Sequence, residues 1–535
     1  MLTRKEPYLW WKLKYLQKMD TANVGYSYHL PSGGWNYKIR NTLSQFSDLF
    51  SEFNKYIAPA YHHDRCERSV QMRIYTMHKG EFVMAFLAFL ACFGLGVFIG
   101  LAGPSPTMTT SVTASSSLGN ISDIYQGPFH VHSHAIGSRS QQLWMFAEIL
   151  TNNDDEEIFD KSFQVSISVD GVKSDHTTEE IFSESDSPNR TQHLRCKKRV
   201  CDEVQILHLG MLEYTHYVIN INFFGLKEFH KRYYIREIVF YFKTYNPAFT
   251  QLETWFRFIF VMTSFLMTFW FAYAMRNYPN GDWAIEQKWL YVLLPLLLTF
   301  NDPLYPMRLI PGKLNFSIFL GNVSQIVFLG VVMLSWLSQY HGLRQNDRGA
   351  CSFYLGKQVS VSLVGIPAII IAFWQASDGY FDQTNNYMMN SYYPIVKLWF
   401  FSAIAIYFVY LLILMIKAYS DLRNMPYFDI RLRCLSIVVG TVTTVMTVLA
   451  LQGWGAASLQ DHWASQPKIH YDTSAPFMAL YGLFNFYIYT LTYLFTPGAG
   501  SVHETAITKD NPAFSMINDS DEEVIYGSDE ESRRP

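Results

Sequence analysis

Eight stretches of this 535-residue chain are apolar over about 20 residues, the length that a helix needs to cross a lipid bilayer. The first lies at 82–102 and contains no charged side chain. The other seven follow a gap of about 150 residues, at 255–275, 289–308, 316–337, 358–375, 395–416, 434–452 and 475–495. We predict a multi-pass α-helical membrane protein with one N-terminal helix followed by a bundle of seven, because a helix satisfies all of its own backbone amides in lipid.

The 82–102 stretch begins too far along the chain for a cleaved signal peptide, because 81 mainly polar residues precede it. We therefore interpret it as a signal-anchor helix. The stretch at 289–308 is the weakest of the seven, since Asn301, Asp302 and Pro303 interrupt it. Proline cannot continue the hydrogen bonding of a helix, so we expect a kink or an early exit there.

The loops between the seven later stretches differ in charge from one side of the membrane to the other. One alternate set contains nine Lys and Arg residues, whereas the opposite set contains three. Basic loops stay in the cytoplasm, so this asymmetry places both termini there. The predicted domains are a cytoplasmic segment at 1–81, the first helix at 82–102, a lumenal or extracellular domain at 103–254, a seven-helix bundle at 255–497 and an acidic cytoplasmic tail at 498–535.

Ionisable side chains are scarce in the predicted spans. Apart from Lys397 at a helix end, and Arg257 and Asp302 near ends, the spans carry no ionisable side chain at mid-membrane depth. Proton pumps and coupled transporters need such groups inside the membrane, so their scarcity argues against these classes. Neutral polar residues could line a polar cavity or form hydrogen bonds between helices, and we favour hydrogen bonds. These residues are Asn322, Gln325, Thr443 and Asn485.

The domain at 103–254 has the residue pattern of a β-sheet. Apolar and polar residues alternate at 142–150, 162–172, 203–209, 215–223 and 235–243. The clearest segment ends in Asp170-Gly171, a favoured two-residue hairpin turn. We predict a small β-sandwich that a Ser- and Thr-rich linker at 105–117 joins to the first helix.

Cys196 and Cys201 are the only cysteines of this domain. A disulfide between them is expected, since the domain is assigned to the oxidising side of the membrane. A zinc site is the poorer interpretation, because it would need two further ligands. Asn120 and Asn189 begin glycosylation sequons on the same side.

Three histidines alternate along one segment of the domain, at His130, His132 and His134. An extended strand would place their side chains on one face. They could sense the acidity of a secretory compartment, but we favour a solvated linker, since no carboxylate partner is evident.

Two short patterns are typical of cytoplasmic sorting signals. Tyr427-Phe-Asp-Ile430 lies in the loop between the sixth and seventh apolar stretches and fits a pattern that clathrin adaptors bind as an extended strand. The other interpretation is that Tyr427 and Ile430 simply lie at the membrane interface. In the tail, Asn511-Pro512-Ala-Phe514 is a similarly short signal.

Ser520 and Ser528 each precede an Asp-Glu-Glu sequence in the tail. Such sites are typical substrates of acidic-directed kinases of the casein kinase 2 type, and a phosphate would deepen the negative charge. A merely solvated acidic tail is the alternative interpretation.

Motifs of catalysis and cofactor binding are missing from the sequence. It contains no Gly-rich phosphate loop, no His-Glu-x-x-His and no Gly-x-Ser-x-Gly, so we expect neither an enzyme nor a bound cofactor. The formal net charge is −3 and the basic residues are spread along the chain, which gives no footprint for nucleic acid.

Several motifs resemble those of the transmembrane protein 181 family, which belongs with Wntless to a group that joins a GOLD domain to seven transmembrane helices. The motifs are Met72-Arg-Ile-Tyr-Thr, Lys243-Thr-Tyr-Asn-Pro-Ala-Phe249, Trp255-Phe-Arg-Phe258, Asp282-Trp-Ala-Ile-Glu-Gln-Lys-Trp289 and Asp510-Asn-Pro-Ala-Phe-Ser-Met-Ile-Asn-Asp-Ser520. The resemblance covers roughly residues 70 to 530. It implies a GOLD-like sandwich over the lumenal mouth of a bundle like that of heptahelical receptors.

The same resemblance implies a receptor or escort that moves cargo through Golgi, endosomes and plasma membrane. The expected partners are the lipid bilayer, clathrin adaptors and an unknown lumenal or extracellular protein or lipidated cargo, but no nucleic acid. Vertebrate members of the family are associated with host susceptibility to bacterial cytolethal distending toxins, so a bacterial toxin belongs among the expected ligands. The alternative function is a channel or transporter formed by the seven-helix bundle.

The predicted orientation can be tested by glycan mapping. Asn120 or Asn189 should bear an N-linked glycan, because both lie in the domain assigned to the lumenal side. Asn518 also begins a sequon, but the acidic tail is assigned to the cytoplasm, so this residue should bear none. Mass spectrometry of glycopeptides decides the matter, and a glycan on Asn518 would reverse the orientation.

Overall fold

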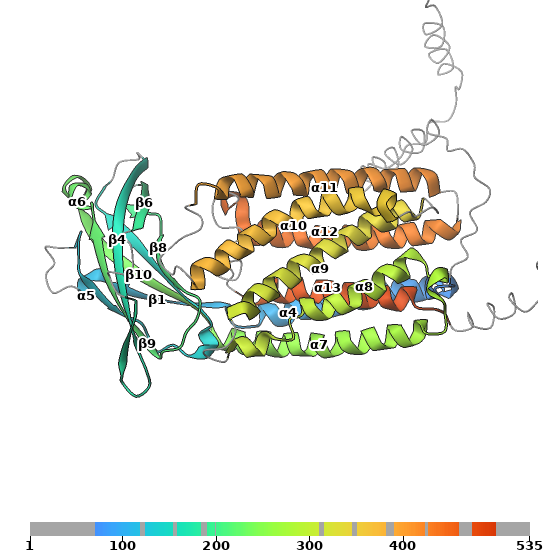
Figure 1. Ribbon diagram of the computed structural model, residues 1–535, viewed down its shortest axis with the longest axis horizontal. Coiled ribbons are helices and arrows are strands. Elements are labelled where there is room, and N and C mark those ends of the chain that lie inside the picture. Colours follow the sequence, from blue (N-terminus) through green and yellow to red (C-terminus); the bar gives the residue numbers. More distant parts are fainter. Residues whose placement is uncertain are drawn as a thin grey trace, which may run out of the picture. The chain divides into compact units, whose positions relative to one another are not determined.

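The computed structural model describes residues 70–117, 124–153, 158–182, 190–197, 199–309, 315–344, 350–380, 390–422, 426–458 and 473–498. All of them belong to one compact unit, His63–Pro535. They form a large antiparallel sheet and a set of long helices (Figure 1). In the chain, the sheet lies between the first long helix and the second, which confirms the predicted fold class.

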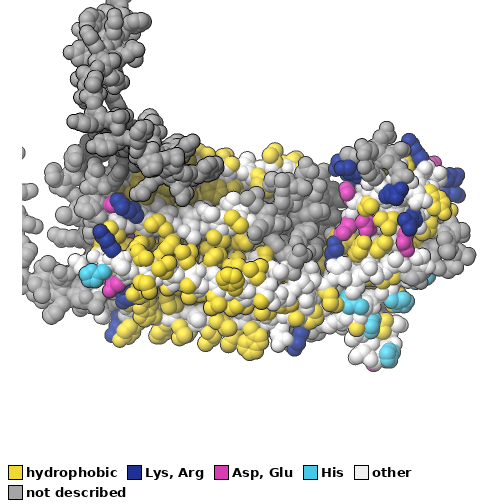
Figure 2. Space-filling model, turned by 180° about the vertical axis from the view of Figure 1, so that it is seen from behind, with side chains coloured by type: hydrophobic (Ala, Val, Ile, Leu, Met, Phe, Trp, Pro, Cys, Tyr) yellow, Lys and Arg dark blue, Asp and Glu magenta, His cyan; other side chains and the backbone are white. Residues whose placement is uncertain are grey.

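The long helices coincide with the predicted apolar stretches. They are α4 (Lys79–Leu101), α7 (Pro247–Met275), α8 (Ile285–Phe300), α9 (Asn315–Gly342), α10 (Ala350–Tyr380), α11 (Tyr393–Leu422), α12 (Pro426–Ser458) and α13 (Ala475–Phe495). In the described ranges, six of these are long and apolar enough to cross a membrane, α8 and α13 being the exceptions. Hydrophobic side chains cover the helices on the face drawn in Figure 2, as lipid contact requires.

Helix α8 is short because it ends where the sequence predicts an early exit. It contains 16 residues, fewer than the about 20 that span a bilayer. Asn301 caps the helix, and Asp302 takes a φ of 55°, a left-handed conformation that a helix cannot continue. The chain then enters a short 3₁₀ helix, Tyr305–Leu309.

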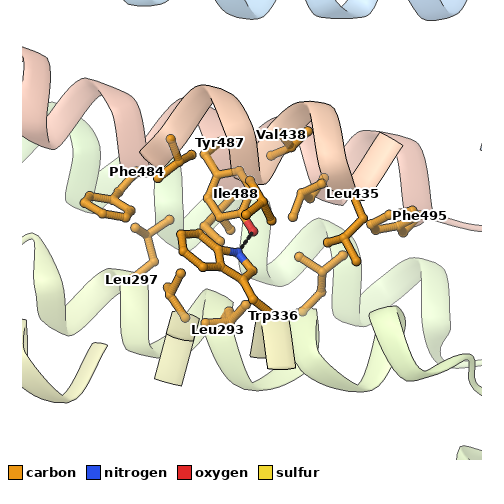
Figure 3. Close-up of a cluster of buried hydrophobic side chains, with 14 of the residues drawn as sticks. Leu293, Leu297, Trp336, Leu435, Val438, Phe484, Tyr487, Ile488 and Phe495 are labelled. Atoms are coloured by element: carbon orange, nitrogen blue, oxygen red, sulfur yellow. Dashed lines mark hydrogen bonds between the residues drawn. The ribbon is translucent and has the colours of Figure 1, made fainter. Parts of the chain in front are cut away.

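Helix α13 is the central helix of the bundle. Fifteen of its 21 residues are buried, and it packs against α4, α7, α8 and α12. Figure 3 shows Phe484, Tyr487 and Ile488 among leucines of α8 and α12, where the Tyr487 hydroxyl accepts a hydrogen bond of 2.9 Å from the Trp336 indole. The tyrosines of α13 lower the mean hydropathy of this helix, and they are tolerated because neighbouring helices surround them.

Helix α4 packs against α13, and the chain segments that flank the two helices also meet. At one end, the Ser474 hydroxyl donates to the Pro104 carbonyl at 2.5 Å. At the other end, the Arg73 amide donates to the Thr496 carbonyl at 2.9 Å. The first and last helices of the bundle are therefore joined at both ends.

The sheet has ten strands, all paired antiparallel, and nearly closes into a barrel. Its main path runs β1-β10-β3-β7-β6-β4-β9-β2, with β5 beside β4 and β8 beside β3. The strands are β1 (Thr107–Thr113), β2 (Phe129–His132), β3 (Leu143–Thr151), β4 (Ile158–Val172), β5 (Thr178–Phe182), β6 (Arg190–Lys197), β7 (Val200–Cys201), β8 (Val204–Leu209), β9 (His216–Phe224) and β10 (Ile235–Tyr245). Inward side chains of these strands form a separate apolar core.

Two segments that we interpreted as linkers are strands. The Ser- and Thr-rich segment contains β1, which pairs with β10 over seven residues. Threonine is β-branched and favours strands, so its abundance there indicated sheet rather than flexible chain. The histidine segment contains β2, which pairs with β9.

The predicted two-residue turn at Asp170-Gly171 is wrong. Strand β4 continues through it, because Gly171 pairs with Glu179 on one side and with Tyr217 on the other. The glycine instead serves a close approach, since a Cβ atom there would lie 2.4 Å from the ring of Tyr214. The actual turn lies between Val172 and Thr178.

The expected disulfide joins β6 to β7. Cys196 and Cys201 are register partners in these strands, and a bond links their sulfur atoms. Because only four residues lie between them, the bridge pins a local hairpin more than it stabilises the whole domain.

The packing of α4 on α13 gives a test with a matched control. A Cβ atom at Gly100 would lie 2.5 Å from the Ala475 Cα, whereas one at Gly94 would meet no atom within 4 Å. Gly100→Ala should therefore lower the free energy of unfolding by about 1–3 kcal/mol, because the two backbones must separate. Gly94→Ala should leave it nearly unchanged. Thermal unfolding of the detergent-solubilised variants measures both, and equal behaviour would contradict this packing.

Candidate functional site

Helix α7 contains a buried ion pair close to its N-terminus. Glu253 and Arg257 lie one turn apart, and their side chains are 0% and 4% exposed. Glu253 Oε1 accepts hydrogen bonds from Arg257 Nε at 3.0 Å and Nη2 at 2.7 Å. Buried charges are costly in a membrane protein, so a pair like this marks a candidate functional site.

Aromatic rings complete the environment of this ion pair. The Arg257 guanidinium carbon lies 4.6 Å from the centre of the Tyr305 ring and 4.5 Å from that of Tyr481. The Tyr305 hydroxyl donates to the second Glu253 oxygen, Oε2, at 2.7 Å. The rings attract the cation and the hydroxyl satisfies the carboxylate, which offsets part of the cost of burial.

A side chain from the sheet domain joins the same network. Gln141, in the loop before β3, donates through Nε2 to Thr250 Oγ1 and to the Tyr305 hydroxyl, both at 2.9 Å. Its φ of 56° is uncommon for a residue other than glycine. A continuous path of contacts therefore runs from the sheet loop through Tyr305 to Glu253 and Arg257.

A second polar cluster lies further along α7. Asn301 and Asn485 exchange two side-chain hydrogen bonds of 2.8 Å each. Ser264 lies 3.1 Å from the Asn301 amide nitrogen and 2.7 Å from the Tyr489 hydroxyl. The cluster links α7, the end of α8 and α13, which confirms the prediction of interhelical hydrogen bonds for Asn485.

The other predicted polar residues behave differently from one another. The Gln325 amide donates to the Tyr481 hydroxyl at 2.7 Å and so links α9 to α13. Thr443 donates to the Val439 carbonyl of its own helix, so this hydrogen bond does not join two helices. Asn322 is partly buried in α9.

A second buried ion pair links α8 to α12. Arg431 Nε donates to Glu286 Oε1 at 2.9 Å, and Nη2 bonds the other oxygen. The two side chains are 1% and 3% exposed. Next to it, Gln287 Nε2 donates to the Phe495 carbonyl at 3.0 Å, which fixes the end of α13.

Helix ends explain why the sequence analysis found few ionisable residues in the spans. Helices α7, α8, α10 and α12 begin earlier than the apolar stretches, so they include Glu253, Glu286, Lys357 and Arg431, all buried. The spacing of Glu253 and Arg257, four residues apart, is a local signal that could have identified the first pair. The second pair joins residues 145 apart, and no local pattern indicates it.

The predicted cytoplasmic signals lie mainly outside the described residues. This holds for Asn511, Pro512, Phe514, Ser520 and Ser528, and also for the sequon residues Asn120 and Asn189. Tyr427 and Ile430 lie among the first five residues of α12 rather than in a loop. Ile430 is 44% exposed.

The histidines of the sheet domain fall into two groups. His130 and His132 are exposed, as a row on one face of β2 requires. His208, which the sequence analysis did not single out, is buried and stacks on Trp144, with ring centres 5.0 Å apart. Burial lowers the pKa of His208 from 6.5 to about 4. The unfolded chain therefore binds this proton more readily than the folded protein, so acidification from pH 6.5 to about 4 destabilises the fold.

Among the described residues, no group of three His, Cys, Asp or Glu side chains could hold a metal ion.

Comparison with known proteins agrees with this division of the chain. Residues 127–245 match the family model described as "TMEM181, GOLD domain", and residues 246–499 match "Wntless-like, transmembrane domain". The boundary falls between Tyr245, the last residue of β10, and Asn246, which caps α7. Human "Transmembrane protein 181" is 38% identical over 467 residues, which cover 86% of this chain and 94% of the human protein.

The buried ion pair of α12 can be tested against an exposed one on the same helix. Arg431→Met leaves Glu286 buried without its cation and should lower the free energy of unfolding by about 3–5 kcal/mol. Arg433 pairs with Asp429 but is 65% exposed, so Arg433→Met should cost less than about 1 kcal/mol. Thermal unfolding in detergent measures both.

A double variant separates the ion pair from side-chain packing. Glu286→Gln with Arg431→Met removes both charges and should be more stable than Arg431→Met alone. A double variant that is less stable than the single one would contradict the role of charge pairing.

Proposed function

The chain belongs to the transmembrane protein 181 family, and from this membership we propose that it is a trafficking receptor or cargo escort of the Golgi, endosomes and plasma membrane. Both termini would lie in the cytoplasm and the sheet domain in the lumen or outside the cell. The combination of a GOLD domain with a Wntless-like membrane domain supports this assignment, because it places a folded binding module on a multi-pass membrane anchor.

The observation that carries the proposal is the hydrogen-bonded path from Gln141 to the Glu253–Arg257 pair. A receptor needs its ligand-binding module to be mechanically joined to its membrane part. Here a sheet loop and two helices share one buried network, so displacement of the loop removes a hydrogen bond from the Tyr305 hydroxyl, which itself donates to the buried Glu253 carboxylate. A lumenal protein, a lipidated cargo and a bacterial toxin are the ligand classes that the family resemblance suggests.

The cytoplasmic signals would choose the route. Tyr427 and Ile430 would occupy two pockets of a clathrin adaptor, and Asn511, Pro512 and Phe514 would act as a second signal. Because the adaptor binds an extended strand, the first turn of α12 would have to unwind, and terminal helical turns are the easiest to open. Phosphate on Ser520 and Ser528 would add negative charge next to this second signal.

A channel or transporter is the second candidate function. The two buried ion pairs favour it, because ionisable groups inside membrane helices often lie on ion pathways. Solute or ion flux through the purified protein in liposomes would support this function over cargo escort.

The sorting proposal makes a prediction about uptake. Tyr427→Ala together with Asn511→Ala should raise the surface level of the protein and slow its internalisation. Loss of an aromatic anchor costs about 2 kcal/mol or more in binding, or at least roughly thirtyfold in adaptor affinity. Antibody-uptake kinetics on living cells provide the measurement.

Phe428→Ala is the matched control for this experiment. It removes a neighbouring aromatic side chain from a position that the adaptor does not read, so uptake should stay normal. If Tyr427 is only an interfacial anchor, its loss lowers expression while internalisation of the surface protein is unchanged. An unaltered uptake rate in a well-expressed double variant would exclude the sorting role.

A further inference from the structure

Strand β1 is an edge of the sheet, because it pairs with β10 alone. The Asn246 amide donates to the Pro106 carbonyl at 3.0 Å, where the ladder between these two strands begins. Hydrogen-bonded and non-hydrogen-bonded pairs alternate in an antiparallel ladder, so the backbone groups of Thr109 and Ser111 point away from β10. Among the described residues, no backbone hydrogen bond reaches β1 from that side.

The inner face of β1 is only partly covered. Met108, Thr110 and Val112 belong to this face, because they lie opposite three core residues of β10, namely Thr244, Phe242 and Phe240. The three partners are at most 1% exposed, whereas Met108 is 41% exposed. The apolar core of the sheet domain is therefore incompletely covered along β1.

Another edge of the same sheet is protected against strand addition. Strand β5 pairs with β4 and carries the exposed side chains of Glu179 and Glu180. A register irregularity lies at Asp170, where β4 meets β5. Charged side chains and bulges prevent a further strand from pairing with an edge. Strand β1, Thr-Met-Thr-Thr-Ser-Val-Thr, contains no charged residue and no proline, and its ladder with β10 is regular.

Strand β2, at the other end of the sheet path, does not pair with β1. A side chain from the segment after β2 reaches it instead, since His134 Nδ1 lies 3.1 Å from Thr110 Oγ1. This contact leaves the outward backbone groups of Thr109 and Ser111 unbonded. An added strand would exchange one side-chain hydrogen bond for a series of backbone hydrogen bonds.

The position of β1 sets the direction of an added strand. Strand β1 begins at Thr107, shortly after α4 ends at Leu101, and runs away from the helices. Every strand pair described in this sheet is antiparallel. A strand added in the same way runs toward the membrane. A membrane protein has this direction when its N-terminus lies on the side of the sheet domain and an extended segment leads into its transmembrane helix.

A second copy of this chain fits the edge less well. Two copies in one membrane are related by an axis along the membrane normal, so both β1 strands run away from the membrane. Pairing of β1 with β1 would then be parallel, unlike every described pair of the sheet, and parallel pairing is slightly less stable per residue.

We propose that the free edge of β1 binds, by strand addition, the extended juxtamembrane segment of a partner membrane protein. The proposal names a class of cargo and rests on the proposed escort function. The seven residues of β1 extend over about 23 Å at about 3.3 Å each, so a partner segment of similar length suffices. Backbone hydrogen bonds supply the affinity, and apolar side chains at alternate positions cover Met108 and Val112.

The test uses the full chain with Ser111→Cys, produced together with a single-span probe protein. The probe has a folded domain on the lumenal side, about four Val-Thr repeats with one cysteine, and a polyleucine transmembrane helix. Oxidation of isolated microsomes should join the two cysteines. A probe with Gly-Ser repeats, and an inverted probe whose repeats follow its helix, should each give at least about fivefold less product, because strand propensity or direction is lost.

Variants of the edge identify the contact. Thr109→Pro removes an outward N–H without removing a bond to β10, and should lower cross-linking about fivefold, as loss of one backbone hydrogen bond predicts. Met108→Lys keeps every backbone group but adds an inward charge that protects an edge, and should do the same. Thr178→Pro is the matched control, because the Lys173 amide bonds the Thr177 carbonyl and so Thr178 points outward from β5.

The control variant should change cross-linking by less than about twofold, and unchanged thermal midpoints show which variants fold. Equal cross-linking of the three probes, no loss in Met108→Lys, or an equal loss in Thr178→Pro would each overturn the proposal. So would preferential cross-linking between two copies, which would assign the edge to a second copy. Isolated microsomes carry out no transport, so a negative result is distinguishable from failure of the trafficking function, which the uptake assay reports.

Discussion

Pairing of buried charge in an apolar interior is the constraint on which the bundle depends. An unpaired ion inside these helices would cost several kcal/mol, so Glu253 must find Arg257 and Glu286 must find Arg431. The second pair holds α8 against α12, while the first gives α7 a charged centre that Tyr305 and Tyr481 surround. Apolar side chains contact lipid about as favourably as they contact another helix, so apolar contacts alone distinguish poorly between different arrangements of the helices. Directional ion pairs of this kind select one arrangement.

The same constraint explains how the sheet domain is attached. Strand β10 passes into α7 within two residues, and Gln141 completes the hydrogen bonding of Tyr305. A flexible tether would leave the Tyr305 hydroxyl without the hydrogen bond that it accepts from Gln141. The attachment is therefore part of the polar core of the protein.

The helices and most central strands could be predicted from sequence because apolar runs of about 20 residues and period-two alternation are local patterns. The exit of α8 at Asn301 was predictable for the same reason. The pairing of Cys196 with Cys201 was predictable because they are the only cysteines of a domain assigned to an oxidising compartment. Helix starts were not, since Glu286 and Arg431 look like loop residues until the fold brings them together. Gly171 resembled a turn residue, but the nearby Tyr214 ring explains the glycine. The network of Gln141 and Tyr305 joins residues 164 apart, so no short pattern could reveal it.

The contact between α4 and α13 has a consequence for biosynthesis. Ribosomes make α4 first and α13 last among the long helices, and the Ser474–Pro104 hydrogen bond joins residues 370 apart. The first helix must therefore wait in the membrane, its glycine face uncovered, until nearly all of the bundle has been inserted. The fold is thus completed only when the chain is nearly complete. A prematurely terminated product would lack α13, so Gly100 of α4 would have no helix packed against it and would be exposed to the quality-control machinery of the membrane.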